Sequence, residues 1–217
     1  MASGPAISIR IASKRFGQST VFSEFRLDVA AGSVVALVGP SGVGKSTLLR
    51  MVAGIDRGFE GTISIDDTPA FAAPATGFLF QDARLLPWLS ALDNICAVAP
   101  FTRVERAQTL LDRVGLHGVE RAYPHQLSGG MQRRVAIARA LAVNPKMLLL
   151  DEPFVSLDMH LAEDLRRVVH DVIRAEGTTV MIVSHVQDDI RELADRVVTI
   201  DRRPAVIISD GWPDRRA

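Results

Sequence analysis

The sequence predicts an α/β fold built on a mainly parallel sheet with helices on both faces. Three observations lead to this prediction. The segment Val34–Val38 is apolar at every position, as expected of a strand that is buried on both faces of a parallel sheet. A glycine-rich turn and an apolar helix at 47–53 follow it directly. From residue 147 onward, strand-like and helix-like patterns alternate, which is typical of parallel strands joined by helices.

The segments that precede the apolar strand are also expected to be strands. Apolar residues alternate with polar ones from Ile7 to Ile11, and a strand-like pattern continues over Val21–Val29. Further strand-like pieces lie at 62–65 and 77–80.

The middle of the chain, from about 82 to 135, has the pattern of a helical insertion. Apolar residues recur at helical spacing over 104–114, and Gly115 ends that helix. A second helix begins at Ser128 and ends before Pro145. The last third then predicts strands at 147–150, 178–183, 197–200 and 206–208, with helices at 161–172 and 186–193.

Composition and charge exclude several classes of protein. The chain has 25 Lys and Arg against 25 Asp and Glu, so it has no net charge that would attract nucleic acid. The single cysteine, Cys96, forms no internal disulfide and is interpreted as a packing residue. No apolar run approaches the ~18–20 residues that span a bilayer. We therefore expect one soluble, intracellular domain covering residues 1–217, with no nucleic-acid partner.

A phosphate-binding loop is predicted between the apolar strand and the helix. The segment fits G-x-x-x-x-G-K-[ST], and its members are Gly39, Pro40, Ser41, Gly42, Val43, Gly44, Lys45, Ser46 and Thr47. Backbone N–H groups of such a loop and the helix N-terminus bind phosphate oxygens. Lys45 would add a full positive charge, and the Ser46 hydroxyl could bind Mg²⁺. The alternative is a glycine-rich turn with a solvated lysine, and the flanking strand and helix argue against it.

Two carboxylates follow the strand at 147–150. Asp151 would hold Mg²⁺, and Glu152 would orient or deprotonate the water that attacks the γ-phosphate. Alone, the pair could equally be two solvated acids at a strand end. Together with the loop upstream, it favours a protein that binds and hydrolyses ATP or GTP.

The segment Leu127-Ser128-Gly129-Gly130-Met131-Gln132 predicts a second anion-binding helix N-terminus. A chain with one phosphate loop has no evident need for a second one at its own site. Its natural use is on the nucleotide of a neighbouring copy in a two-fold dimer.

This segment, shortly before Leu-Leu-Leu-Asp-Glu-Pro, resembles the signature of ATP-binding cassette (ABC) proteins. The resemblance covers about Ile7 to Ile208. It implies a P-loop NTPase fold with an N-terminal antiparallel β subdomain and a helical signature subdomain. It also implies ATP and Mg²⁺ as ligands. The implied site residues are Phe16 on the adenine, Gln81 on Mg²⁺ or the attacking water, Asp158 of the Ser156-Leu157-Asp158 loop at the dimer interface, and His185 on the γ-phosphate.

The sequence departs from the family pattern at two positions. Met131 stands where the family often has glutamine, and Phe16 replaces a commoner tyrosine while keeping a stacking face. Neither change affects Lys45, Asp151 or Glu152, so we expect a hydrolytically competent site.

The segment Asp82-Ala-Arg-Leu-Leu-Pro-Trp88 resembles the corresponding segment of importer ATPases of the nitrate, sulfonate and taurine group. The resemblance implies a head-to-tail dimer around two ATP at the cytoplasmic side of the membrane. Integral membrane permease subunits would be its partners, with a periplasmic or extracellular solute-binding protein acting indirectly. Leu86 and Trp88 could contact the permease or belong to the helical core. Two other functions stay open: a soluble cassette ATPase without a transport role, and a regulatory module that does not hydrolyse ATP.

Overall fold

The computed structural model describes residues 4–70, 76–98, 104–155 and 157–213, so Ser156 lies outside the described residues. The strands are β1 (Ile7–Phe16), β2 (Ser19–Val29), β3 (Val34–Val38), β4 (Glu60–Ile65), β5 (Thr68–Pro69), β6 (Thr76–Leu79), β7 (Met147–Asp151), β8 (Thr179–Val183), β9 (Arg196–Asp201) and β10 (Val206–Gly211). The helices are α1 (Lys45–Val52), α2 (Ala91–Cys96), α3 (Val104–Arg113), α4 (Gly129–Ala142), α5 (Met159–Glu176) and α6 (Gln187–Leu193), with a 3₁₀ turn at Pro124–Gln126.

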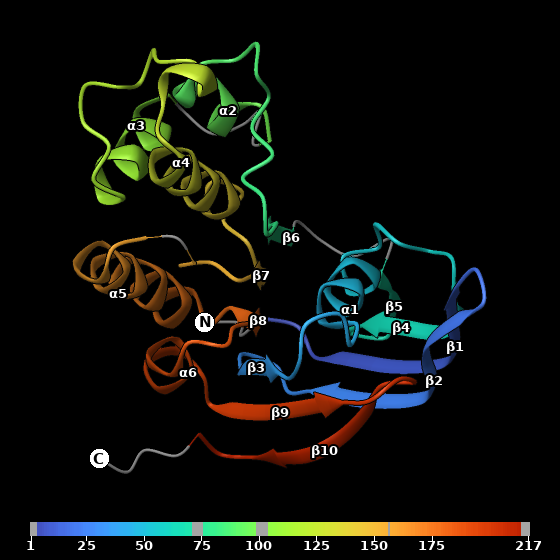
Figure 1. The fold of residues 1–217 in the computed structure, drawn as a ribbon. Coiled ribbons are helices and arrows are strands. Elements are labelled where there is room, and N and C mark those ends of the chain that lie inside the picture. The colour runs from blue at the N-terminus through green and yellow to red at the C-terminus, as the bar shows by residue number, and fades with distance from the viewer. Residues whose placement is uncertain (1–3, 71–75, 99–103, 156, 214–217) are drawn as a thin grey trace.

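A six-stranded sheet forms the centre of the molecule, in the order β10-β9-β3-β8-β7-β6 (Figure 1). The five strands from β9 to β6 are parallel, and β10 pairs antiparallel with β9. The apolar segment Val34–Val38 is β3, and it lies between β8 and β9. The predicted α/β fold with a mainly parallel sheet is therefore confirmed.

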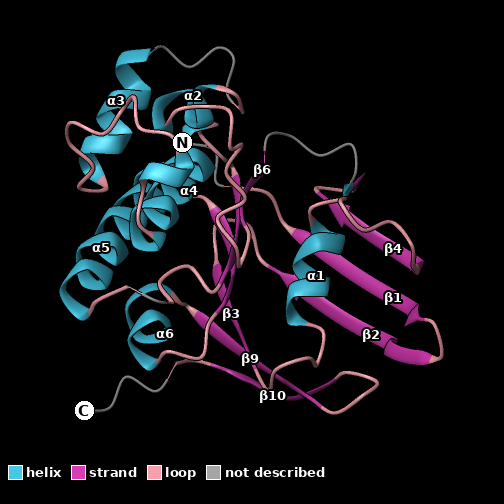
Figure 2. Cartoon of the chain, turned by 45° about the horizontal axis from the view of Figure 1, so that its top comes forward, coloured by secondary structure: helices cyan, strands magenta, loops and turns pink. Residues whose placement is uncertain are grey.

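A second, antiparallel sheet has the order β2-β1-β4-β5. The alternating isoleucines of β1 are buried at Ile7, Ile9 and Ile11, and pack with Leu48 and Leu49 of α1 in one apolar cluster. That cluster also includes residues from one face of the central sheet, so α1 lies between the two sheets (Figure 2). This arrangement fixes the start of α1, and with it the glycine-rich turn, against β2.

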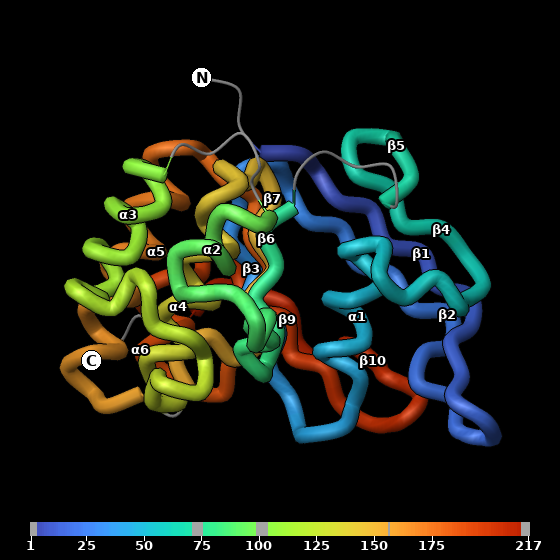
Figure 3. The backbone as a smooth tube through the Cα atoms, turned by 90° about the horizontal axis from the view of Figure 1, so that it is seen from above, coloured from blue at the N-terminus to red at the C-terminus, as the bar shows by residue number. Residues whose placement is uncertain are grey.

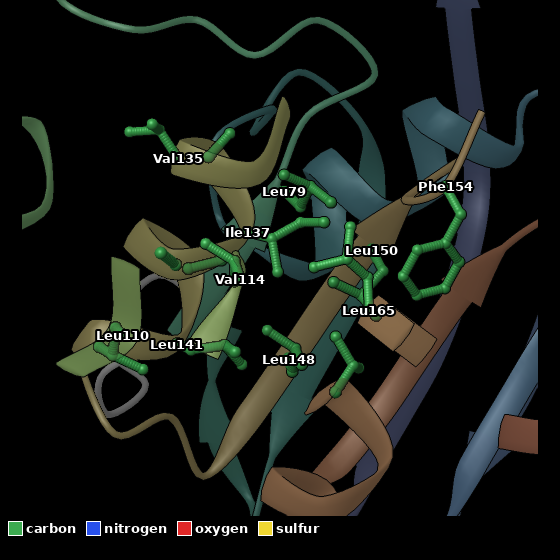
Figure 4. Close-up of a cluster of buried hydrophobic side chains, with 14 of the residues drawn as sticks. Leu79, Leu110, Val114, Val135, Ile137, Leu141, Leu148, Leu150, Phe154 and Leu165 are labelled. Atoms are coloured by element: carbon green, nitrogen blue, oxygen red, sulfur yellow. The ribbon is translucent and has the colours of Figure 1, made fainter. Parts of the chain in front are cut away.

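Helices α2 to α6 cover the other face of the central sheet. Seen from above, they lie on the side opposite to β1, β2 and β4 (Figure 3). Their core joins Ile137 of α4 to Leu148 and Leu150 of β7 and to Leu165 of α5 (Figure 4). Helix α4 runs from Gly129 to Ala142, within the helix predicted between Ser128 and Pro145, and its apolar residues up to Ala142 pack on this sheet face.

The loop that leads into α2 is held by one buried amide. Asn94 is fully buried, and its Oδ1 accepts from the Leu86 backbone N–H at 2.7 Å. Its Nδ2 donates to the carbonyls of Leu86, Leu89 and Ser90 at 3.0–3.1 Å. The bonds fix the backbone on both sides of Trp88, whose own side chain is 69% exposed. The alternative that Trp88 belongs to the helical core is therefore wrong, whereas Leu86 is half-buried.

No helix among the described segments is both long enough and apolar enough to cross a membrane.

Replacing Asn94 with alanine should lower the free energy of unfolding by about 1–3 kcal/mol, because backbone groups of the 86–90 loop lose their partners. Urea denaturation followed by far-UV circular dichroism measures the change. Unaltered stability of Asn94→Ala would contradict the structural role given to this amide.

Candidate active site

A cleft of about 370 Å³ lies beside the glycine-rich turn, at the carboxyl ends of the central strands. It is lined by Phe16, Ser19, Val21, Ser41, Gly42, Gly44, Lys45, Ser46, Thr47, Gln81, Glu152, Val183 and Arg203. Residues of the predicted phosphate-binding loop, Gln81 and the strand-end Glu152 thus meet at one place. Their elements are far apart in the sequence, and the parallel sheet brings them together.

The turn between β3 and α1 depends on glycine at two positions. Gly39 has a φ of 147°, and a Cβ there would lie 1.9 Å from the Ile200 carbonyl oxygen. Gly44 has a φ of 119°, and a Cβ there would lie 2.7 Å from a methyl group of Val21. A larger residue at Gly39 would push the turn away from β9 of the central sheet, and one at Gly44 would push it away from β2 of the antiparallel sheet. Val43, in contrast, buries its side chain in the core, so it can offer only its backbone to a ligand.

Lys45 folds back over the turn that precedes it. Its Nζ donates to the carbonyls of Gly39 at 2.7 Å and Pro40 at 2.8 Å. Burial lowers the pKa of Lys45, while the nearby charges of Glu152 and Asp151 raise it. An anion in the cleft would offer this ammonium group a stronger acceptor than neutral carbonyls.

Asp151 ends β7 directly beneath the start of α1. Its side chain is only 1% exposed, and its Oδ1 accepts from the Ser46 hydroxyl at 2.9 Å. The other oxygen, Oδ2, is buried without a hydrogen-bond partner. Burial raises the pKa of Asp151, the Ser46 bond lowers it and the charge of Glu152 raises it. A buried carboxylate oxygen of this kind needs a cation.

These oxygens fit a magnesium ion. Mg²⁺ prefers one or two protein oxygens together with waters and phosphate oxygens. The Ser46 hydroxyl, the Asp151 carboxylate and the nearby Gln81 side chain would supply the protein part. In the described part of the chain there is no cluster of three or more His, Cys, Asp or Glu residues that could hold a metal by itself. The site therefore suits a metal that arrives with a phosphate group.

Glu152 is placed by an unusual backbone conformation. Its φ is 50°, in the left-handed region that non-glycine residues rarely adopt, and its N–H donates to the Val183 carbonyl at 2.9 Å. Its carboxylate Oε1 lies 3.6 Å from Nδ1 of His185. Both side chains are accessible, Glu152 at 21% and His185 at 64%. A water held near them could lose its proton to the carboxylate.

The turn that carries His185 is fixed by a buried network. The Ser184 hydroxyl donates to Asp189 at 2.6 Å and accepts from the Val186 backbone N–H at 3.1 Å. The Arg166 guanidinium donates to the other Asp189 oxygen at 3.2 Å. Burial raises the pKa of Asp189, and its bonds to Ser184 and Arg166 lower it. This network holds the backbone on both sides of His185.

The predicted signature residues lie elsewhere. Ser128 caps α4 by accepting from the Met131 N–H at 3.3 Å, and Ser128 and Gly129 are exposed. Asp158 is also exposed and caps α5 by accepting from the Leu161 N–H at 3.0 Å. In the described chain, Ser128, Gly129, Gly130 and Asp158 do not line the cleft. Ser128, Gly129 and Asp158 are therefore presented on the surface, outside the lining of their own chain's cleft.

Phe16 lies in the cleft wall with its side chain half exposed, at 53%. The ammonium of Lys14 lies 4.4 Å from its ring centroid. Lys14 is itself buried and bonded to Asp56 at 2.7 Å and to the Gly58 carbonyl at 2.9 Å. The phenyl ring thus has one face next to a buried cation.

Sequence reasoning missed four residues of the lining. Ser19 and Val21 lie on β2, and Val183 ends β8, where no motif marked them. Arg203 lies in the turn between β9 and β10, and its Nε donates to the Gly42 carbonyl at 2.8 Å. Their positions depend on how the antiparallel sheet and the last hairpin pack around the turn. No local signal in the sequence reports that packing.

Comparison with known proteins gives a consistent result. Residues 22–155 match the protein family described as "ABC transporter". The aliphatic sulfonates import ATP-binding protein SsuB 2 of Burkholderia cenocepacia is 44% identical over 204 residues, covering 92% of this chain and 75% of that protein. The sulfate/thiosulfate import ATP-binding protein CysA 2 of Rhizobium meliloti is 42% identical over 215 residues, covering 93% of this chain and 58% of that protein.

A solved structure is also similar. It is a dimeric, post-hydrolysis state of an ATP-binding cassette bound to ADP and Pi. The TM-score is 0.86 at 28% identity, and the alignment covers 97% of this chain and 99% of that chain.

Asp151→Asn should stabilise the chain in the absence of nucleotide. Because the pKa of Asp151 is raised in the folded chain, its ionised form weakens the fold at neutral pH, and asparagine removes that cost while keeping a partner for Ser46. We expect a gain of about 1 kcal/mol at pH 7. The gain should vanish as the pH falls toward the ordinary carboxyl value of 3.8.

Thermal unfolding of both proteins, with and without Mg·ATP, measures this effect. The variant should also lose the additional stabilisation that Mg·ATP gives to the wild type. A variant that is less stable without nucleotide, or equally stabilised by Mg·ATP, would contradict the metal-binding assignment.

Proposed function

This chain is an ATPase that belongs to the ABC transporter family, and on that premise we propose that it drives solute import through separate membrane subunits. The observation that supports the proposal most directly is the cleft that brings Lys45, Ser46, Gln81 and Glu152 together above the buried Asp151. The cassette would be one domain over residues 1–217, with the helical segment from about 82 to 135 as its signature subdomain.

The phosphates of ATP would be bound by the loop at 39–47. Its backbone N–H groups and the N-terminus of α1 would bind phosphate oxygens, and Lys45 would exchange its two carbonyl partners for the β- and γ-phosphates. Phe16 would stack on the adenine ring from the cleft wall. Mg²⁺, when bound through Ser46, Gln81 and Asp151, would neutralise phosphate charge.

Hydrolysis would depend on Glu152, Gln81 and His185. Glu152 would accept a proton from the attacking water, which Gln81 helps to orient. His185, on its fixed turn, would contact the γ-phosphate and keep the Glu152 carboxylate in place. The chemical step is transfer of a phosphoryl group to water, and positioning and electrostatic stabilisation supply most of the catalysis.

Two copies of the chain would complete each site. The exposed Ser128 and Gly129 at the N-terminus of α4 have no role at their own cleft, and a Cβ at Gly129 would meet no atom within 4 Å. This open helix end would bind the γ-phosphate held by the partner copy, with Gly130 beside it and Asp158 at the interface. ATP would then join the two copies head to tail, because it contacts both only in the closed dimer.

The membrane partner would bind near Trp88. This indole is 69% exposed beside the half-buried Leu86, on a loop whose backbone is fixed by Asn94. Aromatic anchors on rigid backbone dominate many protein interfaces. We propose that integral membrane permease subunits dock here at the cytoplasmic side of the membrane, with a solute-binding protein acting on their other side. Within the predicted nitrate, sulfonate and taurine group, the relative named for aliphatic sulfonates supports a sulfonate as the solute, and the relative named for sulfate and thiosulfate adds a sulfate-type oxyanion as an alternative.

Glu152→Gln should abolish ATP hydrolysis while ATP binding persists. The amide cannot accept the proton of the attacking water, so turnover should fall by about 10²–10⁴-fold. Phosphate release with Mg·ATP measures turnover, and size-exclusion chromatography with ATP should show a trapped dimer of the variant. Full activity of the variant, or a monomer at saturating ATP, would count against the proposed mechanism.

Trp88→Ala should weaken binding to co-expressed permease subunits by at least about tenfold, because truncating a tryptophan at the centre of an interface often costs about 2 kcal/mol of binding free energy. Trp212→Ala is a matched control, because Trp212 is 85% exposed and directly follows β10, a strand that lies far from α2 in the fold (Figure 1). Co-purification from detergent membranes measures the effect. Equal retention of both variants would refute the proposed docking site. Failure of the wild type to co-purify with any permease would favour an ATPase without a transport role.

A further inference from the structure

One buried guanidinium on α4 has no part in the function proposed so far. Arg133 lies about one and a half helical turns after Ser128, directly after the signature segment. Only 6% of the residue is exposed. Its hydrogen bonds all go to backbone carbonyls, which belong to Phe80, Gln81, Asp151, Glu152 and Pro153. A guanidinium has five N–H groups, so these five carbonyls use its full donor capacity.

The carbonyls come from two loops that carry catalytic side chains. Nη1 donates to Gln81 at 2.7 Å and to Phe80, in the loop after β6. Nη2 donates to Asp151, the last residue of β7, at 2.8 Å and to Glu152 just after it, and Nε donates to Pro153 at 2.9 Å. One side chain of α4 therefore holds the backbone of two predicted catalytic residues, Gln81 and Glu152, and also that of the predicted metal ligand Asp151.

Burying the Arg133 guanidinium carries a desolvation cost that lowers the stability of the folded chain. The bonds are to neutral carbonyls, and burial lowers the pKa of Arg133 while the charges of Asp151 and Glu152 raise it. An apolar side chain of similar volume would avoid the desolvation cost. A cation at this depth points to a requirement for its bonds and not only for its volume.

The bonds also explain how Glu152 keeps its left-handed backbone. A residue in this conformation persists only where its surroundings fix it on several sides. The Glu152 N–H is held by Val183 at 2.9 Å, and its carbonyl is held by Arg133. The direction of the carboxylate toward the cleft therefore depends in part on where α4 lies.

We propose that Arg133 is a positioning residue that links α4 to Gln81 and Glu152. The inference rests on the proposed function, in which the Ser128 end of α4 binds the partner's ATP. Movement of α4 when that ATP binds is transmitted through one rigid guanidinium to the catalytic residues of its own cleft. Each ATP of the dimer thus sets the catalytic geometry at the other site.

The same helix provides a matched control. Arg139 lies in the next turns of α4 and donates to the carbonyls of Arg84 at 2.8 Å and Ala83 at 2.7 Å. Arg84 also has a left-handed backbone, with a φ of 45°, and burial lowers the pKa of Arg139 as well. In the described chain, however, its hydrogen bonds do not reach the strand end that carries Glu152.

The test compares Arg133→Lys and Arg139→Lys with the wild type. Lysine keeps the charge and provides three donors without the planar fork, so the two loops cannot both be held. We expect Arg133→Lys to lower kcat by about 10–100-fold, as for a small displacement of catalytic groups, with KM for ATP changed by less than about twofold. Arg139→Lys should leave both constants within about twofold.

Hydrogen exchange of the nucleotide-free proteins gives a second readout that needs no activity. Arg133→Lys should raise exchange at both 80–82 and 151–154, whereas Arg139→Lys should raise it only near 83–85. Wild-type kcat in Arg133→Lys, or an equal loss in Arg139→Lys, would overturn the inference. A wild type that hydrolyses no ATP would refute the proposed function instead. Exchange would then decide the inference, because an increase confined to one loop contradicts a shared link.

Discussion

The buried carboxylate of Asp151 is the constraint on which the rest of the site depends. Its Oδ2 has no hydrogen-bond partner, and the side chain is 1% exposed at the end of the central strand β7. Such a group weakens the fold unless a cation arrives to pair with it. The chain supplies one fixed contact, the Ser46 hydroxyl at 2.9 Å, and arranges Lys45 and Glu152 around the same cleft. The buried carboxylate thus lowers the stability of the nucleotide-free chain, and binding of Mg²⁺ with a phosphate group would restore that stability.

Helix α4 connects the exposed Ser128 segment with the catalytic residues of the cleft. Its N-terminus, capped by Ser128, is exposed and does not line its own cleft, while its buried face packs on β7. The same helix carries Arg133, which holds the backbone of Gln81 and Glu152. An element that would bind one copy's ATP is therefore attached to the catalytic residues of the other copy's site. A dimer built in this way would hydrolyse ATP only after both helices are in place, which is a physical route to coupling hydrolysis with closure.

Much of the fold and of the candidate site could be predicted from the sequence, because the patterns that indicate them lie in short contiguous segments. The apolar Val34–Val38 strand, the glycine-rich turn and the carboxylates after β7 are contiguous patterns, and the structure joins them in one cleft. The N-cap role of Ser128 was also readable from its neighbours. The partners of Arg133 and Arg203 were not, since they depend on backbone carbonyls brought close by packing. The bounds of α4 were predictable for the same reason as its cap, since Ser128 begins the helix and Pro145 lies just beyond its end.

The head-to-tail site is tested most directly by cross-linking two different cysteine variants. One chain would carry Ser41→Cys in the exposed part of the phosphate loop, and the other Gly129→Cys at the open end of α4, both with Cys96→Ser and Glu152→Gln. The account predicts that a disulfide forms between the two variants when ATP is added and not in its absence. Absence of this bond with ATP, or ATP-dependent bonds only between two Gly129→Cys chains, would contradict a site shared between the Lys45 loop and the partner's Ser128 helix.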